Sequence, residues 1–582
     1  MTAENSKSYK DNPFGAWLLC ESDFKNAEWW ITYDPIHEPE PLTPLAGCLW
    51  AELHQYGYCS ASEKVYYPFS HGVLCRLNLD GYMALSAPLR TSEREENERM
   101  NKFYELLDKF KYDFTSLWGD FKHKGQVGLF LRKIMQNYSE IGAFNLEKWC
   151  FNLDFLDKLN NLYNCDLLDL FFKFFDILKS HWTIHFAIMY PSFYLYNKFE
   201  KLTEELLGIN DQNPIFQRLL QGFENKISEC TFRLWSLAQN AKVLGLTSLF
   251  ESSDLKSIFK ILQVKSENWM EMFHEFLLFY GVRSDNPFDL YKETWLENPL
   301  KPLSLIKNYV FSDIDLLDKH RRVVGERDKV LQRLLQKITP DKTDEFMNLL
   351  RAAQMAYCWN EDHNYWIEQF GFAVMRYIIM EMGRRLHLNG CIKDKSDIFF
   401  LNPQELSAMF LPAVSTGRSL HNITEKRKNQ WITAINKKPP LIAGEKTILE
   451  ENPIVSKLFG LPPPTPHKGP DIVGYPGSPG TVVDKALVVY DLSVIYQIKD
   501  KAILVVPSLN PAWTFIIPFL KGLVTDFGGT LSHAAIVCRE YGIPSVVGTS
   551  NATKLIKNGD KIMLDGNKGY VWILGNCEVM PK

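Results

Sequence analysis

The segment Thr525–Gly548, TDFGGTLSHAAIVCREYGIPSVVG, holds the residues of this 582-residue chain whose types and spacing point most directly to chemistry. It begins at the end of an apolar run that is typical of a strand. Gly528 and Gly529 then permit a tight turn that can lie close to a phosphate. Ser532 is predicted as the N-cap of a short helix that follows. His533 therefore falls in the first turn of that helix.

The predicted position of His533 suits it to accept a phosphoryl group and pass it on. The free N–H groups and the positive dipole end of a helix N-terminus disfavour imidazolium and attract a phosphoryl group. A neutral imidazole is a nucleophile, and histidine titrates near neutral pH. Taken alone, the pattern equally describes a Gly-Gly turn and a capped helix with a structural histidine. The residues around it are therefore needed to distinguish a phosphoryl-accepting histidine from a structural one.

The residues around this turn extend the pattern over a whole domain. They are Ser478-Pro479-Gly480, Asp526 to Val537, Arg539-Glu540, Gly542 to Pro544, Val546 to Gly548, Asn551 to Thr553 and Asp565-Gly566. With them, residues 474–574 resemble the swivelling phosphohistidine domain of the PEP-utilising enzymes, a family that includes rifampin phosphotransferase. The resemblance implies that His533 is phosphorylated. The candidate phosphate-binding residues are Gly528, Gly529, Thr530, Ser532 and Arg539.

The chain divides by pattern into a large helical part and a small α/β part. Residues 1–26 read as a poorly specified leader, and helical periodicity dominates residues 27–458. Proline-rich residues 459–473 predict a semi-rigid linker. Short β-rich runs then alternate with turns over residues 474–577. We therefore expect a multidomain protein in which a mainly α-helical substrate-binding domain precedes a small α/β swivelling phosphohistidine domain.

Composition excludes several classes of protein. Apolar residues make up 46% of the chain, which is enough for sizeable hydrophobic cores. The net charge of −4 gives no indication of a surface that binds nucleic acid. Eleven scattered cysteines, without paired metal-ligand spacing, fit reduced thiols in a cytosolic protein. The most apolar stretch, Leu167–Tyr196, contains six charged or histidine side chains. It is predicted as a buried helix pair rather than a membrane span.

The helical part carries a weaker resemblance to the rifampin-binding domain of the same family. It rests on Asp34–Leu45, Tyr280–Pro299 and Asp397–Leu406. Because the first of these motifs reaches Pro41, no room remains upstream for the ATP-grasp domain of the larger relatives. The arrangement resembles the large subunit of phenylphosphate synthase. The resemblance implies that a separate ATP-grasp protein charges His533 with ATP and Mg²⁺, and that this chain itself binds no cofactor.

Transfer to a hydroxyl needs a base for the proton and a cation for the phosphoryl oxygens. The candidate cations are Arg283 and Arg376, and the candidate bases are Asp289, Glu361, Asp362 and His363. Each could equally be a surface charge or part of an ion pair. No metal site is expected. His181 and His185 lie four residues apart, but the glutamate of a metalloprotease pair is missing.

Three functions remain open. The leading prediction is a phosphotransferase that acts on a hydroxyl of a small organic substrate. A dehydratase would phosphorylate the hydroxyl and then eliminate it, and would need a base beside the acceptor carbon. A phosphocarrier would bind a partner protein through the helical domain, and a filled core in place of an open cavity would favour it.

Overall fold

The computed structural model of this chain describes residues 12–20, 23, 29–32, 34, 38–65, 73–86, 93–109, 159–411, 419–437, 439–440, 442–444, 460, 469–490, 502–509 and 511–576. Most of the predicted leader and residues 461–468 of the predicted linker lie outside these ranges. Within the described part of the chain, no helix is both long and apolar enough to cross a membrane.

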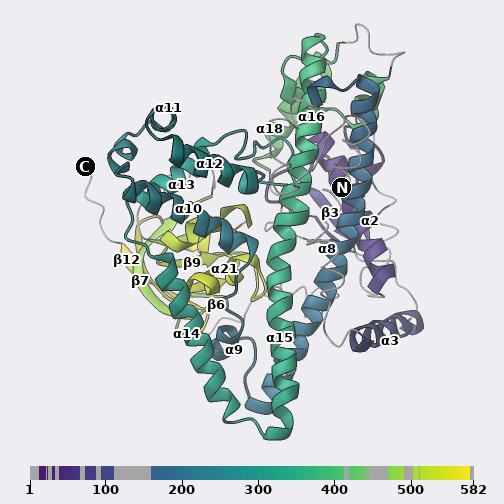
Figure 1. The fold of residues 1–582 in the computed structure, drawn as a ribbon. Coiled ribbons are helices and arrows are strands. Elements are labelled where there is room, and N and C mark those ends of the chain that lie inside the picture. Colours follow the sequence, from purple (N-terminus) through teal and green to yellow (C-terminus); the bar gives the residue numbers. More distant parts are fainter. Residues whose placement is uncertain are drawn as a thin grey trace, which may run out of the picture.

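Long helices dominate the helical part and pack side by side (Figure 1). They are α2 (Pro44–Val65), α8 (Asn164–Leu207) and a rod made of α15 (Pro340–His363), the π-helical turn η6 (Asn364–Gln369) and α16 (Phe370–Leu388). The helix α8 runs for 44 residues through Pro191, so the predicted helix pair over 167–196 is wrong. Gly208 ends α8 in the left-handed region at φ 66°, where a side chain would be strained.

Shorter helices form a second group beside the rod. They are α9 (Pro214–Leu219), α10 (Lys226–Val243), η5 (Thr247–Glu251), α11 (Leu255–Lys265), α12 (Glu267–Tyr280), α13 (Leu300–Val310) and α14 (Leu316–Leu335). Their starts follow local capping rules. The Asn225 side chain accepts hydrogen bonds from Ile227 and Ser228 at the start of α10, and Asn213 caps α9 ahead of a proline.

A small sheet near the N-terminus was not predicted. It contains β1 (Trp29–Ile31), β2 (Leu74–Leu77), β3 (Met83–Ser86) and β4 (Ile442–Gly444), in the order β2-β3-β1-β4. The remaining elements around it are η3 (Gly15–Trp17), α3 (Glu93–Lys109), η7 (Lys395–Phe400), α17 (Pro403–Phe410) and α18 (His421–Ala434). Since β4 pairs with β1, the end of the helical part returns to its beginning.

An eight-stranded sheet forms the C-terminal domain and confirms the predicted α/β fold. Its strands are β5 (Ile472–Val473), β6 (Tyr475–Ser478), β7 (Thr481–Val488), β8 (Ile503–Val506), β9 (Gly522–Thr525), β10 (Ser545–Val547), β11 (Asp560–Asp565) and β12 (Tyr570–Asn576). The order is β5-β12-β11-β7-β8-β9-β10-β6, with β7 to β10 parallel. The helical pieces are η9 (Pro511–Phe519), α21 (His533–Tyr541) and α22 (Ala552–Leu555). Strand β5 lies inside the range predicted as linker, so the sheet begins earlier than expected.

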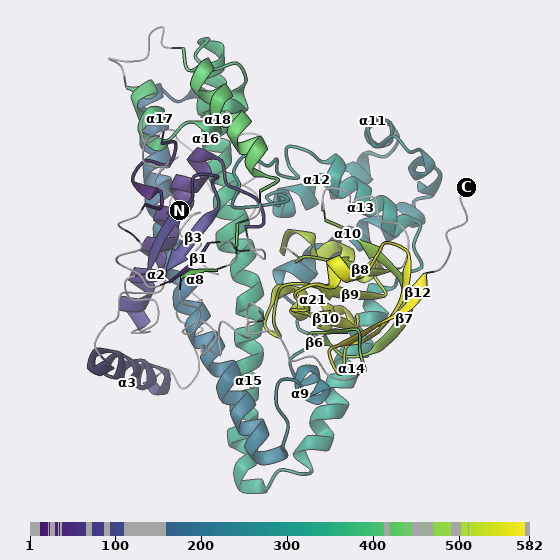
Figure 2. The ribbon, with the colours of Figure 1, turned by 180° about the vertical axis from the view of Figure 1, so that it is seen from behind.

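The C-terminal domain is docked against the helical part. Figures 1 and 2 show it beside α15, below α10 and α13 and along α14. The buried apolar residues of η9 and α21 belong to the same core cluster as those of the helical part. The opposite face of the sheet, against which α22 packs, forms a separate core cluster. The helix that begins with His533 therefore lies at the interface between the two domains.

Candidate functional site

The turn between β9 and α21 is held by a buried aspartate. The carboxylate of Asp526 accepts hydrogen bonds from the backbone and hydroxyl of Thr553 and from the hydroxyl of Thr549. Gly528 has a φ of +111°, and a Cβ there would lie 2.9 Å from the Ser532 Oγ. Only glycine fits both the backbone conformation and this close approach, as the sequence predicted.

His533 is the first residue of α21, and its ring faces the helical domain. Its Nδ1 lies 2.8 Å from Oε2 of Glu361 near the end of α15, and the two side chains are 9% and 1% exposed. The contact has the distance of an ion pair, but its alignment is too poor for a hydrogen bond. A carboxylate beside Nδ1 favours the tautomer with a proton on that nitrogen, and this leaves the lone pair on Nε2.

Several polar atoms around this contact are buried and have no hydrogen-bond partner within the part of the chain that the structure describes. They are His533 Nε2, Ser532 Oγ and both carboxylate oxygens of Glu361. Ser532 occupies the predicted N-cap position, but its side chain makes no capping hydrogen bond. Buried groups of this kind are rare in folded proteins and cost stability, so these atoms are candidates to contact a polar ligand.

Thr530 and Arg539, predicted to bind phosphate, have protein partners here. The hydroxyl of Thr530 donates to Asp211 Oδ2 at 3.2 Å. Arg539 is 2% exposed and donates to the carbonyl oxygens of Gly477 and Thr530 at 2.6 and 2.8 Å. Arg539 therefore ties the turn before α21 to β6, a role that the sequence did not suggest.

Arg539→Met is expected to lower the free energy of unfolding of the C-terminal domain by about 2–6 kcal/mol. Two buried carbonyl groups would lose their donors, and each loss costs about 1–3 kcal/mol. Urea denaturation followed by tryptophan fluorescence measures the change. Lys561→Met, at an exposed position of β11, is the control and should change stability by less than about 0.5 kcal/mol. A stable Arg539→Met protein that only failed to hold phosphate would contradict the structural role.

The three consecutive candidate bases point in different directions, as expected for a helix. Glu361 faces His533. Asp362 accepts a hydrogen bond from the backbone N–H of Lys226, at the start of α10, at 2.8 Å. His363 points toward Glu368, with its Nε2 3.6 Å from that carboxylate. Of these three, Glu361 is therefore the one that the structure brings to the histidine.

The other three candidates lie elsewhere in the helical domain. Arg376 forms a two-point ion pair with Glu297 at 2.7 and 2.8 Å, so its charge is already compensated. Arg283 is buried over the Trp295 ring, and two of its nitrogens have no hydrogen-bond partner in the described part of the chain. Burial raises the pKa of Asp289 to about 6. Among the described residues, no hydrogen bond or ion pair joins Arg283, Asp289 or Arg376 to His533.

Asp289 and Arg376 nevertheless belong to one small cleft. Its lining also includes Ser284, Lys292, Gln369 and Phe372. One oxygen of the Asp289 carboxyl accepts hydrogen bonds from Thr43 and the backbone of Tyr291, while the other has no partner among the residues described. The cleft has a volume of about 10 Å³, room for about one water molecule, and neither His533 nor Glu361 lines it.

The docking interface uses polar residues that sequence reasoning missed. The carboxylate of Glu540 accepts from the backbone N–H groups of Gly222 and Phe223 at 3.0 and 2.9 Å. The Tyr357 hydroxyl donates to the Ile536 carbonyl at 2.9 Å. Burial raises the pKa of Glu540 from its usual 4.5 to about 8, although the two backbone donors and Arg539 oppose the rise. Glu540 belongs to the family pattern around His533, but no local pattern predicts its contacts or those of Tyr357, because each partner comes from a distant segment.

Docking is expected to weaken as the pH rises from about 5 to 8. In this window the docked Glu540 keeps a proton that the separated, solvated carboxyl would lose. The docking equilibrium should therefore fall by up to about tenfold per pH unit and level off above pH 8. Small-angle X-ray scattering measures the accompanying expansion. Glu540→Gln keeps a carbonyl acceptor without the titration and should remove the dependence. An unchanged slope in that variant would assign the pH effect to another group.

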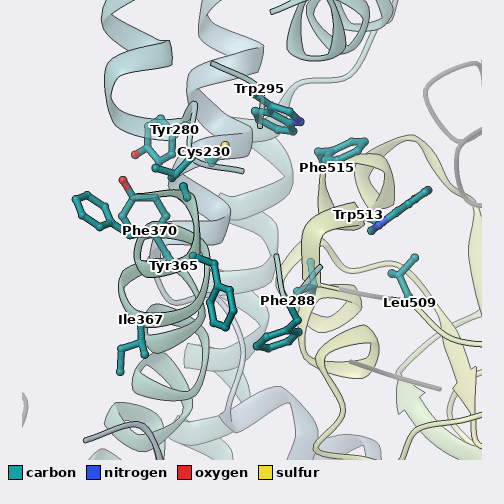
Figure 3. Packing of buried hydrophobic residues seen from close by; sticks show 14 of the residues in the cluster. Cys230, Tyr280, Phe288, Trp295, Tyr365, Ile367, Phe370, Leu509, Trp513 and Phe515 are labelled. Carbon is teal, nitrogen blue, oxygen red and sulfur yellow. The ribbon is translucent and has the colours of Figure 1, made fainter. Parts of the chain in front are cut away.

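Aromatic residues of η9 fill the rest of the interface. Figure 3 shows Phe515 close to Trp295, with ring centroids 5.7 Å apart, and Trp513 on the side of the C-terminal domain. The Trp513 indole N–H donates to the Asp285 carbonyl at 3.0 Å. Phe519 contacts Tyr309 at 4.4 Å between centroids. Buried aromatic anchors of this kind supply much of the free energy of an interface.

Comparison with known proteins identifies two parts of the chain. Residues 498–569 match the PEP-utilising enzyme mobile domain. Residues 184–361, from α8 to Glu361, match the rifampicin phosphotransferase fourth domain. The resemblance predicted from the sequence is therefore confirmed. The two residues of the His533–Glu361 contact come from one matched region each.

Three relatives indicate how far the similarity extends. The chain is 29% identical to the uncharacterized phosphotransferase YvkC of Bacillus subtilis over 67% of this chain and 47% of that protein. It is 30% identical to chondramide synthase of Chondromyces crocatus over 68% of this chain and 10% of that protein. It is 29% identical to rifampicin phosphotransferase of Bacillus cereus over 54% of this chain and 36% of that protein. In each case, the chain spans less than half the length of the relative.

Proposed function

Because the chain combines a PEP-utilising mobile domain with a rifampicin phosphotransferase fourth domain, we propose that it is a phosphotransferase component. His533 carries a phosphoryl group, and the helical domain holds a small organic substrate whose hydroxyl receives it. The observation that carries this proposal is the contact between His533 Nδ1 and Glu361 Oε2 at 2.8 Å, across the domain interface. This contact brings the carrier histidine to a buried carboxylate of the substrate domain.

The acceptor oxygen attacks phosphorus, the bond between phosphorus and Nε2 breaks, and its electron pair returns to the imidazole. A proton on Nδ1, held toward Glu361, makes the leaving group a neutral imidazole rather than an anion. A carboxylate of the docking face takes the hydroxyl proton. Glu361 is the candidate, since its Oε1 finds no hydrogen-bond partner among the described residues. Positioning and charge compensation supply most of the rate enhancement in phosphoryl transfer.

The phosphoryl donor has to reach His533 in a different arrangement of the domains. The His533 side chain is 9% exposed while it faces α15, so a donor protein cannot approach Nε2 in the docked state. We therefore infer that the C-terminal domain separates from the helical part, is charged by an ATP-grasp protein that uses ATP and Mg²⁺, and docks again. The polar contacts made by Glu540 and Tyr357 are then remade in every cycle.

The proposal is tested by charging the native protein chemically and following the phosphate. Phosphoramidate, a small-molecule donor, should add one acid-labile phosphate to His533, which peptide mass spectrometry locates. The charged protein is then incubated with a set of hydroxylated aromatic and natural-product compounds. A product heavier by one phosphate supports transfer, whereas a product lighter by one water identifies a dehydratase. The absence of any acid-labile phosphate on His533 would overturn the proposal.

One observation favours a second candidate function, a phosphocarrier. His533 and Glu361 touch directly, so nothing separates the two side chains in the docked state. If charged His533 never modifies a small molecule but passes its phosphate to a protein, the carrier function replaces the enzyme. A compound bound at the Asp289 and Arg376 cleft would favour the enzyme instead.

A further inference from the structure

Three metal-ligating side chains meet in the core of the helical domain, outside the His533–Glu361 contact. They are His185 of α8, His363 at the end of α15 and Glu368 of η6, and all three are buried. Their ligand atoms lie within 4.8 Å of one another. Glu368 Oε1 is 3.7 Å from His185 Nδ1 and 3.6 Å from His363 Nε2.

The π-helical turn is what aligns two of these ligands. His363 and Glu368 are five residues apart, and in an α-helix this spacing would turn the two side chains well away from each other. A π-helical turn closes its hydrogen bonds five residues apart, so it places such a pair on one face. Asn364 and Gln369 show the same spacing, since the Gln369 amide donates to Asn364 Oδ1 at 2.6 Å. Segments of this kind recur at functional sites.

Supporting contacts orient the ligands as a metal site requires. His363 Nδ1 lies 3.1 Å from the Trp359 carbonyl oxygen, which fixes the proton on Nδ1 and leaves the lone pair of Nε2 toward Glu368. The Asn364 amide donates to Glu368 Oε2, so the other oxygen, Oε1, is the one that faces the histidines. His185 stacks against Trp182 with ring centroids 5.5 Å apart, which fixes the plane of its ring.

The distances suit a shared cation better than direct hydrogen bonds. Gaps of 3.6 and 3.7 Å between nitrogen and oxygen exceed the usual length of a hydrogen bond. Two ligands of a tetrahedral zinc ion, each bound at about 2.0–2.1 Å, are separated by about 3.4 Å. The Glu368 side chain is 4% exposed, and a bound cation would compensate a charge buried at this depth.

We propose that His185, His363 and Glu368 bind a divalent first-row metal ion, with Zn²⁺ as the best match. Two imidazoles and one carboxylate are a ligand set that zinc accepts, with the fourth position left to water or another small ligand. The sequence did not reveal this site, because the glutamate that His185 lacks nearby comes from a segment far along the chain. The proposal is independent of phosphoryl transfer.

Metal content and a spectroscopic probe test the site in the full chain. The protein is stripped with a chelator, dialysed against equimolar ZnCl₂ and analysed by mass spectrometry for bound metal. We expect one equivalent of zinc. Co²⁺ added in its place should give the strong visible bands of four-coordinate cobalt. Less than a tenth of an equivalent, together with a spectrum like that of aqueous cobalt, would overturn the proposal.

Variants assign the metal to these ligands. Glu368→Gln and His363→Gln should each weaken zinc binding by about 100-fold or more, since loss of even a supporting contact costs about 10–100-fold. His274→Asn, at an exposed position of α12, is the matched control and should bind zinc like the native chain. If a variant misfolds, metal binding is tested on the native chain alone, by its zinc-dependent rise in Tm and by its cobalt spectrum. Native-like zinc affinity in both folded variants would overturn the proposal.

Discussion

His533→Asn is expected to abolish phosphate charging and to lower transfer by about 10⁴-fold or more, because removal of a covalent nucleophile eliminates the intermediate itself. Asparagine is close to histidine in size and remains polar beside Glu361, so the interface should still form. Charging with phosphoramidate followed by intact mass measures the first effect. Single-turnover transfer to an acceptor identified with the native protein measures the second.

The same substitution at an exposed histidine controls for loss of an imidazole in general. His274→Asn should charge and transfer like the native chain. Full activity of His533→Asn would show that another residue carries the phosphate. Peptide mapping would then identify that residue, because the acid-labile label would move with it.

The C-terminal domain could be predicted closely because its signals are local. Strand β9, the glycine turn and the start of α21 follow one another within Gly522 to Tyr541, so short-range rules of turns and caps apply. The helix begins at His533, directly after Ser532, the predicted N-cap position. The small sheet built on Trp29–Ile31 escaped prediction, because its strands of three or four residues are too short to show an alternating pattern.

The partners of the candidate residues could not be predicted, because they depend on packing between distant segments. Arginine binds anions in many proteins, and this made Arg376 and Arg539 reasonable candidates for phosphate. The fold instead pairs Arg376 with Glu297 and uses Arg539 to hold backbone carbonyl groups. Glu361 was one of four equivalent candidate bases until the docked domain brought His533 within 2.8 Å of it.

The docking interface predicts which residues affect the phosphorylation of His533 and which affect the transfer of its phosphate to the substrate. Under the proposed function, charging needs only the C-terminal domain and its donor. Transfer also needs the face of α15 against which His533 lies. A substitution on α15 should therefore affect one half-reaction and spare the other, and Glu361 is the residue at which this separation is sharpest.

Glu361→Gln is expected to slow transfer from phosphorylated His533 by about 10²–10⁴-fold, the range that general base catalysis supplies. Glutamine keeps the size of the side chain but cannot accept the hydroxyl proton, and it no longer stabilises a proton on His533 Nδ1. Charging by phosphoramidate should stay within about twofold of the native rate, since Glu361 lies on the helical domain. Asp362→Asn is the matched control, because its carboxylate faces Lys226 and should alter transfer only a few-fold. A larger loss of transfer in Asp362→Asn than in Glu361→Gln would indicate that Asp362, and not Glu361, is the base. An equal loss of charging and transfer in Glu361→Gln would indicate that Glu361 only holds the two domains together.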